Sequence, residues 1–196
     1  ITGYGTVTPI GNNANSFWNA LKEYKCGIDK ISRFDTTNFS TKLSAEVKEF
    51  NTENFTSREQ RNLALHTYYA ISSTKEAIQM AKLESNVEDE YRFGVIIGSA
   101  IGGISTIEEE HQKLVKDSTP KQISPYLIPK VLVDSVASNV SILAKAKGHC
   151  MSCTSACSSS NTSIGEAYRL IKDGYQDVMI CGGAEASITP ISVAGF

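Results

Sequence analysis

The chain has 196 residues, a formal net charge of -2, and a composition that is 41% hydrophobic and 20% charged. These values are ordinary for a globular protein, and they exclude a disordered or collagen-like chain. There is no basic surplus of the kind that neutralises phosphates in nucleic-acid-binding proteins. No run approaches the roughly 20 continuous apolar residues that a membrane span needs. We therefore expect one domain over residues 1–196, with neither a nucleic-acid partner nor a membrane span.

Five cysteines, an odd number, are spread along the chain. In a chain of this size with no secretory signal they favour a reducing compartment, so we expect a protein that is not secreted. Both ends are expected to be cut from a longer protein, with any targeting peptide outside this sequence. Cys26 and Cys181 are expected to pack, because neither lies among small residues at the start of a helix.

The first quarter of the chain predicts a loop, a helix and a short strand. Residues 5–11 contain two glycines and a proline and read as a loop, after which Asn13 or Asn15 can cap a helix. Residues 25–41 show no periodicity and are expected to be irregular. Alternation of apolar and polar residues over 43–47 then predicts a short strand.

The longest helical pattern runs from Thr56 to Leu83, where apolar residues recur at three-to-four spacing. It predicts two helices, or one helix broken near Asn62. The apolar run 93–99 is bounded by glycine and predicts a buried strand. Ser105 is expected to cap the helix that follows it.

The second half alternates between helix and strand. Residues 124–129 are expected to form a turn, and 131–143 a helix. A strand over 150–154, a helix over 158–172 and a buried strand over 178–181 follow. This alternation predicts an α/β fold in which helices cover a sheet.

The most informative residue is Cys157, which lies between a predicted strand and a predicted helix. A side chain there projects from a sharp strand-to-helix turn, as in a nucleophile elbow. Unpaired N–H groups and the dipole at a helix N-terminus favour the thiolate, the reactive form of cysteine. The amide of Cys157 can supply one oxyanion-hole donor. Small neighbours leave the sulfur open to a substrate carbonyl: Ser155, Ala156, Ser158, Ser159 and Ser160.

Other roles for these cysteines remain open at this point. Cysteine is among the most buried residue types, so Cys157 could simply pack. Cys150 and Cys153 have C-x-x-C spacing, and with Cys157 they could form a metal or redox site. The only histidine nearby is His149, and adjacent side chains on a strand point to opposite faces. We therefore expect no metal site.

These motifs resemble those of the β-ketoacyl-[acyl-carrier-protein] synthases, the elongating condensing enzymes of dissociated fatty-acid synthesis. The resemblance covers nearly the whole chain. It is carried, in chain order, by Gly3-Tyr4-Gly5-Thr6-Val7-Thr8-Pro9-Ile10-Gly11, Arg33-Phe34-Asp35, Gly98-Ser99-Ala100-Ile101-Gly102-Gly103, Ile123-Ser124-Pro125-Tyr126-Leu127-Ile128-Pro129, Ser155-Ala156-Cys157, Gly182-Gly183-Ala184-Glu185-Ala186, Thr189-Pro190 and Ala194-Gly195-Phe196.

The resemblance implies a thiolase-like fold, of which this chain is the N-terminal half of a five-layered αβαβα sandwich with a mixed five-stranded sheet. It implies a decarboxylating Claisen condensation in which Cys157 carries the acyl group and malonyl-acyl carrier protein supplies the two-carbon unit, giving 3-ketoacyl-acyl carrier protein. Ile101 and Leu127 match positions that line the acyl pocket, Leu127 from across a dimer interface. The protein needs no cofactor of its own, because phosphopantetheine arrives on the acyl carrier protein. The expected partners are acyl carrier protein and a second copy in a homodimer.

The resemblance also implies that catalytic histidines and a lysine lie in a second half of the protein. His66, His111 and His149 do not match them, and His66 and His111 are expected on helix surfaces. The segment alone is thus expected to be inactive. A plastid-type organelle or the bacterial cytoplasm is the expected location.

Three alternatives are kept. The serines at 158–160 resemble ketosynthases of polyketide synthases. A non-catalytic chain-length partner subunit shares the fold but lacks the nucleophilic cysteine. A metal or redox domain would use Cys150, Cys153 and Cys157.

Overall fold

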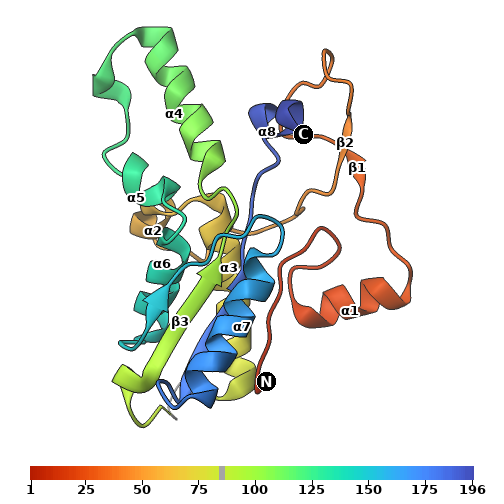
Figure 1. Ribbon diagram of the computed structural model, residues 1–196. Coiled ribbons are helices and arrows are strands. Elements are labelled where there is room, and N and C mark those ends of the chain that lie inside the picture. Colours follow the sequence, from red (N-terminus) through yellow and green to blue (C-terminus); the bar gives the residue numbers. More distant parts are fainter. Residues whose placement is uncertain (84–86) are drawn as a thin grey trace.

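The computed structural model describes residues 1–83 and 87–196, and its centre is a sheet of three parallel strands (Figure 1). The strands are β3 (Phe93–Gly98), β4 (Cys150–Met151) and β5 (Val178–Gly183), in the order β4-β3-β5. Val95 of β3 lies opposite Cys150 on one side and Ile180 on the other. Helices lie on both faces of this sheet, so the predicted α/β class is confirmed.

The predicted single sheet of five mixed strands is not what the described residues form. Two further strands, β1 (Asp29–Lys30) and β2 (Leu43–Ser44), make a separate antiparallel pair. The segment before them packs against a helix instead of joining the sheet. A Cβ on Gly3 would stand 2.2 Å from the Ala77 carbonyl oxygen, and one on Gly5 2.0 Å from that of Ser73. These glycines let the backbone touch the helix directly.

The helices of the first half follow the sequence pattern. Helix α1 (Ala14–Lys22) begins after Asn13, whose side chain accepts a hydrogen bond from the amide of Ser16. Helix α2 (Ser57–Asn62) ends where a break was predicted, and α3 (Leu65–Ala81) starts after two extended residues. The 3₁₀ turn η1 (Glu90–Arg92) then leads into β3.

Helix α4 (Ile104–Asp117) begins earlier than predicted. Gly103 occupies the cap position and Ser105 lies inside the first turn, so the prediction that Ser105 caps this helix is wrong. The glycine is required there because a Cβ at Gly103 would stand 2.5 Å from the Lys130 carbonyl oxygen.

Pro129 does not mark a turn but lies in a short helix, α5 (Leu127–Val131), which follows the 3₁₀ turn η2 (Pro120–Gln122). Proline fits there because the first turn of a helix leaves its N–H groups unpaired. The predicted helix over 131–143 is therefore divided, and its main part is α6 (Ser135–Ala144).

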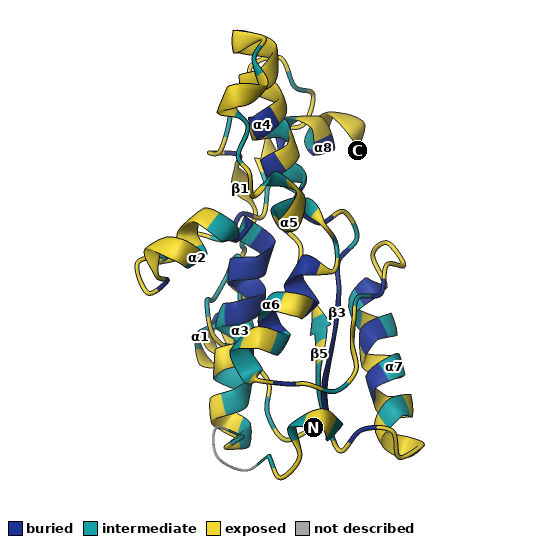
Figure 2. Ribbon diagram, turned by 90° about the vertical axis from the view of Figure 1, so that its left-hand side faces the viewer, coloured by how far each residue is buried: buried dark blue, intermediate teal, exposed yellow. Residues whose placement is uncertain are grey.

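One face of β3 carries the main core. Helices α3 and α6 pack on it, and Figure 2 shows the buried residues gathered along these three elements. The cluster consists of Phe55, Leu63, Tyr68, Ala70, Ile71, Phe93, Val95, Ile97, Val136, Ala137, Val140 and Ala146.

The other face of the sheet is covered by α7 (Ser159–Lys172), and the last helix is α8 (Pro190–Gly195). The core on this face is small and consists of Ile96, Cys153 and Ala167. Strand β5 is an edge strand whose residues are half-buried or exposed, so the prediction of a fully buried strand there is wrong. No helix in the described part of the chain is long and apolar enough to cross a bilayer.

Candidate active site

Cys157 lies in the tight turn between β4 and α7, two residues before the helix begins, and it is exposed. The residue before it, Ala156, has a φ of 52°, the left-handed conformation that a residue with a Cβ rarely adopts. Such strained residues gather at functional sites, where the surrounding structure holds them in place. The position is the one that the sequence predicted.

Serine hydroxyls hold this turn. The Ser159 hydroxyl accepts from the amide of Ser155 at 3.0 Å and donates to the carbonyl of Ala156 at 2.7 Å. The Ser158 hydroxyl donates to the carbonyl of Ser155 at 2.8 Å, and the hydroxyls of Ser155 and Thr162 are 2.7 Å apart. The hydroxyls of the serine run thus stabilise the turn.

The first amides of the helix are not all free. The amides of Ser158 and Ser159 donate to the carbonyls of Ser155 and Ala156, each at 3.1 Å. The prediction that unpaired amides favour a thiolate is therefore wrong for these two groups.

Two glycines bring the start of α7 down onto the carboxyl ends of the strands. A Cβ at Gly98 would stand 2.5 Å from the carbonyl oxygen of Ser159, and one at Gly183 2.7 Å from Cβ of Ser160. The carboxyl edge of a parallel sheet is where open α/β folds place their ligands. The close approach therefore places Cys157 at the functional edge.

The loop that carries Ile101 lies at the same edge. The hydroxyl of Thr154, in the segment before the Cys157 turn, donates to the carbonyl of Ser99 at 3.1 Å. The amide of Gly103 donates to the carbonyl of Val131 at 3.3 Å, which joins this loop to α5. The Ile101 loop therefore contacts both the segment before the Cys157 turn and the end of α5, the helix that begins at Leu127. Ile101 is exposed and Leu127 is half-buried.

Glu185 is a polar residue at this edge for which no role was predicted. Its carboxylate accepts from the amides of Ala100 at 2.8 Å and Ile101 at 3.1 Å, and from the hydroxyls of Ser99 and Ser187. Ser99, Ala100 and Ile101 lie 84 to 86 residues before Glu185 in the chain, so their spacing in the sequence gives no signal of this contact.

His66 is buried rather than on a helix surface, with 1% of its area exposed, so that prediction is wrong. Its Nε2 has no hydrogen-bond partner in the described residues. Burial lowers the pKa of His66, and the charge of Glu185 partly opposes this. The apolar residues Leu63 and Ala70, three residues before and four residues after His66 in the sequence, were a signal of burial. His111 is exposed on α4, as predicted.

The other cysteines differ from the prediction in which of them are buried. Cys26 and Cys181 are exposed, so the prediction that they pack is wrong; Cys26 lies in an open loop and Cys181 on the edge strand. Cys153 is the buried one. Cys150 and Cys181 are exposed as residues, but their thiol groups are partly buried, and this burial raises the pKa of both thiols. In the ranges 1–83 and 87–196, no three His, Cys, Asp or Glu residues are grouped so that they could hold a metal ion.

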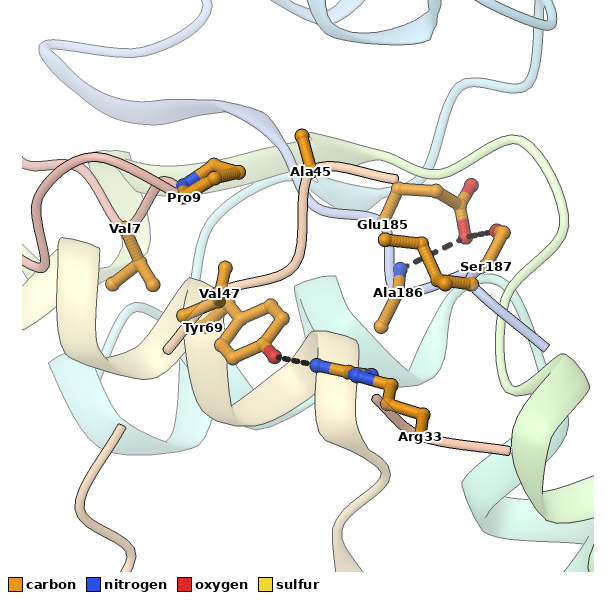
Figure 3. A pocket seen from close by; sticks show the side chains of 10 residues that line it. Val7, Pro9, Arg33, Ala45, Val47, Tyr69, Glu185, Ala186 and Ser187 are labelled. Carbon is orange, nitrogen blue, oxygen red and sulfur yellow. Dashed lines mark hydrogen bonds between the residues drawn. The ribbon is translucent and has the colours of Figure 1, made fainter. Parts of the chain in front are cut away.

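A cavity of about 160 Å³ is lined in part by Glu185, Ala186 and Ser187 (Figure 3). Its walls include Val7, Val47 and Tyr69, and the guanidinium of Arg33 donates to the Tyr69 hydroxyl at 3.0 Å. Neither Cys157 nor Ile101 lines it. The Cys157 turn is therefore not part of this cavity.

Comparison with known proteins agrees with this arrangement. The profile of the family described as "Beta-ketoacyl synthase, N-terminal domain" matches residues 1–196. The chain is 40% identical over 197 residues to a 3-oxoacyl-[acyl-carrier-protein] synthase 2 of Vibrio cholerae, and 42% identical over 198 residues to one of Staphylococcus aureus. It is covered completely in both matches but spans only 47% and 49% of these relatives, about half their length.

Among solved structures, the ishigamide ketosynthase/chain length factor superposes with a TM-score of 0.92 at 22% identity, covering all of this chain and 49% of the other. This likeness confirms the predicted thiolase-like fold. The profile match over the full chain shows that the chain belongs to the β-ketoacyl synthase family.

Proposed function

We propose that the whole protein containing this chain is a 3-oxoacyl-[acyl-carrier-protein] synthase of fatty-acid elongation. Both curated relatives carry that name and match the entire chain. The observation that carries the proposal is the placement of Cys157, which is exposed in a strained turn at the carboxyl edge of a parallel sheet. A nucleophile needs that combination of access and fixed position.

The first half-reaction is acyl transfer to Cys157. Its thiolate attacks the carbonyl carbon of an acyl thioester on the phosphopantetheine arm of acyl carrier protein. The new bond joins Cys157 sulfur to the acyl carbon, the bond from that carbon to the pantetheine sulfur breaks, and the carrier leaves as a thiol after taking up a proton. The amide of Cys157 is a donor to the oxyanion that forms in between.

The second half-reaction makes the carbon–carbon bond. Malonyl-acyl carrier protein loses carbon dioxide, and the electron pair left on its carbon attacks the acyl group on Cys157. The thioester bond breaks, 3-ketoacyl-acyl carrier protein leaves and the Cys157 thiolate is restored. Covalent capture thus divides one difficult condensation into two easier steps. The groups that move protons belong, on this proposal, to the second half of the protein.

Ile101 and Leu127 form part of the acyl pocket on this proposal, with Leu127 contributed across a homodimer interface. Within one subunit, the loop that carries Ile101 contacts the last residue of α5 through the amide of Gly103 and the carbonyl of Val131, so on this proposal each subunit holds in place the α5 whose Leu127 the other subunit's pocket uses. Both side chains are apolar, which suits a wall for a hydrocarbon chain.

A role as a ketosynthase or chain length factor of polyketide assembly is the second candidate. The serine run at 158–160 resembles the polyketide ketosynthases, and the ishigamide ketosynthase/chain length factor shares the fold of this chain at 22% identity. Cys157 argues against the chain length factor, because a partner of that kind lacks the nucleophile.

The test is condensation by the whole protein with acyl- and malonyl-acyl carrier protein, followed by mass spectrometry of the product. Cys157→Ser should abolish 3-ketoacyl formation, because serine lacks the thiolate. Cys26→Ser, at another exposed thiol, should leave the rate unchanged. Condensation that survives Cys157→Ser contradicts the proposal.

A further inference from the structure

We propose that Glu185 is a positioning residue that fixes the wall of the acyl pocket through the loop of residues 99–103. This inference rests on the proposed function, because it concerns the fit of an acyl chain. Glu185 follows β5, whereas the loop follows β3, so the carboxylate joins the carboxyl ends of two neighbouring strands.

One oxygen of Glu185 gathers the loop. Its Oε2 accepts from the amide of Ala100 at 2.8 Å, from the amide of Ile101 at 3.1 Å and from the hydroxyl of Ser99 at 3.3 Å. The Ser99 hydroxyl in turn accepts from the amide of Gly102 at 3.1 Å. Successive backbone amides that converge in this way form a small anion-binding concavity, which the carboxylate fills.

The other oxygen holds the carboxylate in place. Oε1 accepts from the Ser187 hydroxyl at 2.7 Å and from the Ala186 amide at 3.3 Å, which Figure 3 draws beside the cavity. Arg33 lines the same cavity but bonds the Tyr69 hydroxyl, and the described residues contain no ion pair of Glu185. The carboxylate is therefore committed to backbone and hydroxyl donors.

The loop of residues 99–103 packs directly against the backbone of α5. A Cβ at Gly102, whose φ is +73°, would stand 2.7 Å from the carbonyl oxygen of Val131, and one at Gly103 would stand 2.5 Å from that of Lys130. Backbone touches backbone here, with no flexible side chain between. A shift of the Ile101 loop must therefore displace α5, which begins at Leu127.

A second carboxylate holds the far end of α5. Glu110 is buried, and it accepts from the amide of Ser124 at 2.8 Å and from Lys113 at 2.7 Å. The amide of Leu127 donates to the carbonyl of Ser124 at 3.0 Å. The two segments expected to line the pocket are thus clamped between Glu185 and Glu110.

The experiment measures kcat/KM of the whole protein for a long-chain and a short-chain acyl carrier protein, and compares their ratio between wild type and Glu185→Gln. Glutamine keeps the shape of the side chain but replaces one acceptor oxygen by a donor, so part of the amide set must lose its partner. A long chain contacts more of the displaced wall, so the long-to-short ratio should fall by about tenfold, equivalent to about 1.4 kcal/mol. Alkylation of Cys157 should be unchanged.

The ratio separates positioning from mere stability, because a smaller folded fraction lowers both values equally. Glu166→Gln is the matched control, since Glu166 makes a surface ion pair with Arg169 and should leave the ratio unchanged. Glu110→Gln provides an independent variant if Glu185→Gln does not fold, and should shift the ratio in the same direction. Ratios within twofold of wild type in the folded variants overturn the Glu185 proposal. A wild type that condenses neither chain overturns the proposed function instead.

Discussion

The two faces of the central sheet differ in the size of the side chains that are buried against them. On the face of α3 and α6, large apolar side chains such as Val136 and Val140 are fully buried. On the other face, α7 turns small residues inward at four-residue spacing: Ser159, Ser163 and Ala167 are 4%, 0% and 2% exposed. Its large apolar residues Ile164, Tyr168 and Ile171 remain exposed.

This difference separates stability from function. The large residues of the first face supply most of the burial, which drives folding. The small residues of α7 let the helix lie close to β3 and β5, where Gly98 and Gly183 meet it. The site is thus set at the thinly packed face.

The largest loss of stability is expected on the α3 and α6 face. Ile97→Ala should lower the free energy of unfolding by about 2–5 kcal/mol, because it removes a buried side chain and leaves a cavity. Ile142→Ala, at a residue of α6 that is 77% exposed, should change it by less than about 0.5 kcal/mol. Denaturant unfolding of the whole protein measures both, and equal effects would contradict the assignment of the core.

A smaller loss of stability, but a large loss of function, is expected where α7 meets β3. Gly98→Ala places a Cβ against the Ser159 carbonyl, and relieving this clash should cost about 1–3 kcal/mol. Because the displaced backbone carries the Cys157 turn, the rate of Cys157 alkylation should also change. An unchanged alkylation rate in a folded Gly98→Ala protein would show that the close contact does not position the sulfur.

The matched change on the outer side of α7 should have the opposite sign. No atom of the described residues lies within 4 Å of a Cβ built at Gly165, in the middle of the helix. Gly165→Ala should therefore raise the free energy of unfolding by about 0.5–1 kcal/mol, through the lower conformational entropy of the unfolded chain. Destabilisation on the same unfolding curves would mean that this side of α7 is already tightly covered in the whole protein.

The smallest effect is a pH dependence from His66, on the well-packed face. Burial lowers the pKa of His66 in the folded protein, so below its ordinary value of about 6.5 the unfolded state binds the extra proton first. Stability should fall as the pH drops from that value toward the folded-state pKa, and then level off. His66→Phe should remove this part of the profile without loss at neutral pH, because the orphaned Nε2 disappears. A profile identical to wild type would show that other groups cause the acid sensitivity.

Local patterns predicted those parts of the fold that depend on neighbours in sequence. The break before α3, the buried strand β3 and the start of α7 follow from apolar periodicity and from runs of small residues. The exposure of β5 and the separation of β1 and β2 depend on which strands pair, which no single segment encodes.

In the candidate site, too, some features could be predicted from neighbours in sequence and others depend on long-range contacts. The position of Cys157 could be predicted because a strand, small residues and a helix adjoin it in sequence. The use of the serine hydroxyls within the turn, and the carboxylate of Glu185 under the Ile101 loop, could not. Glu185 and Ala100 are 85 residues apart, and only the parallel pairing of β3 with β5 brings them together.

The most direct test of the central claim is to find the acyl group on the enzyme. The whole protein is incubated with acyl carrier protein loaded with an acyl chain, without malonyl substrate, then digested and sequenced by mass spectrometry. We expect one thioester, on Cys157, which disappears when malonyl-acyl carrier protein is added. An acyl group on another residue, or product formation with no acyl group on Cys157 at any time, would contradict the account.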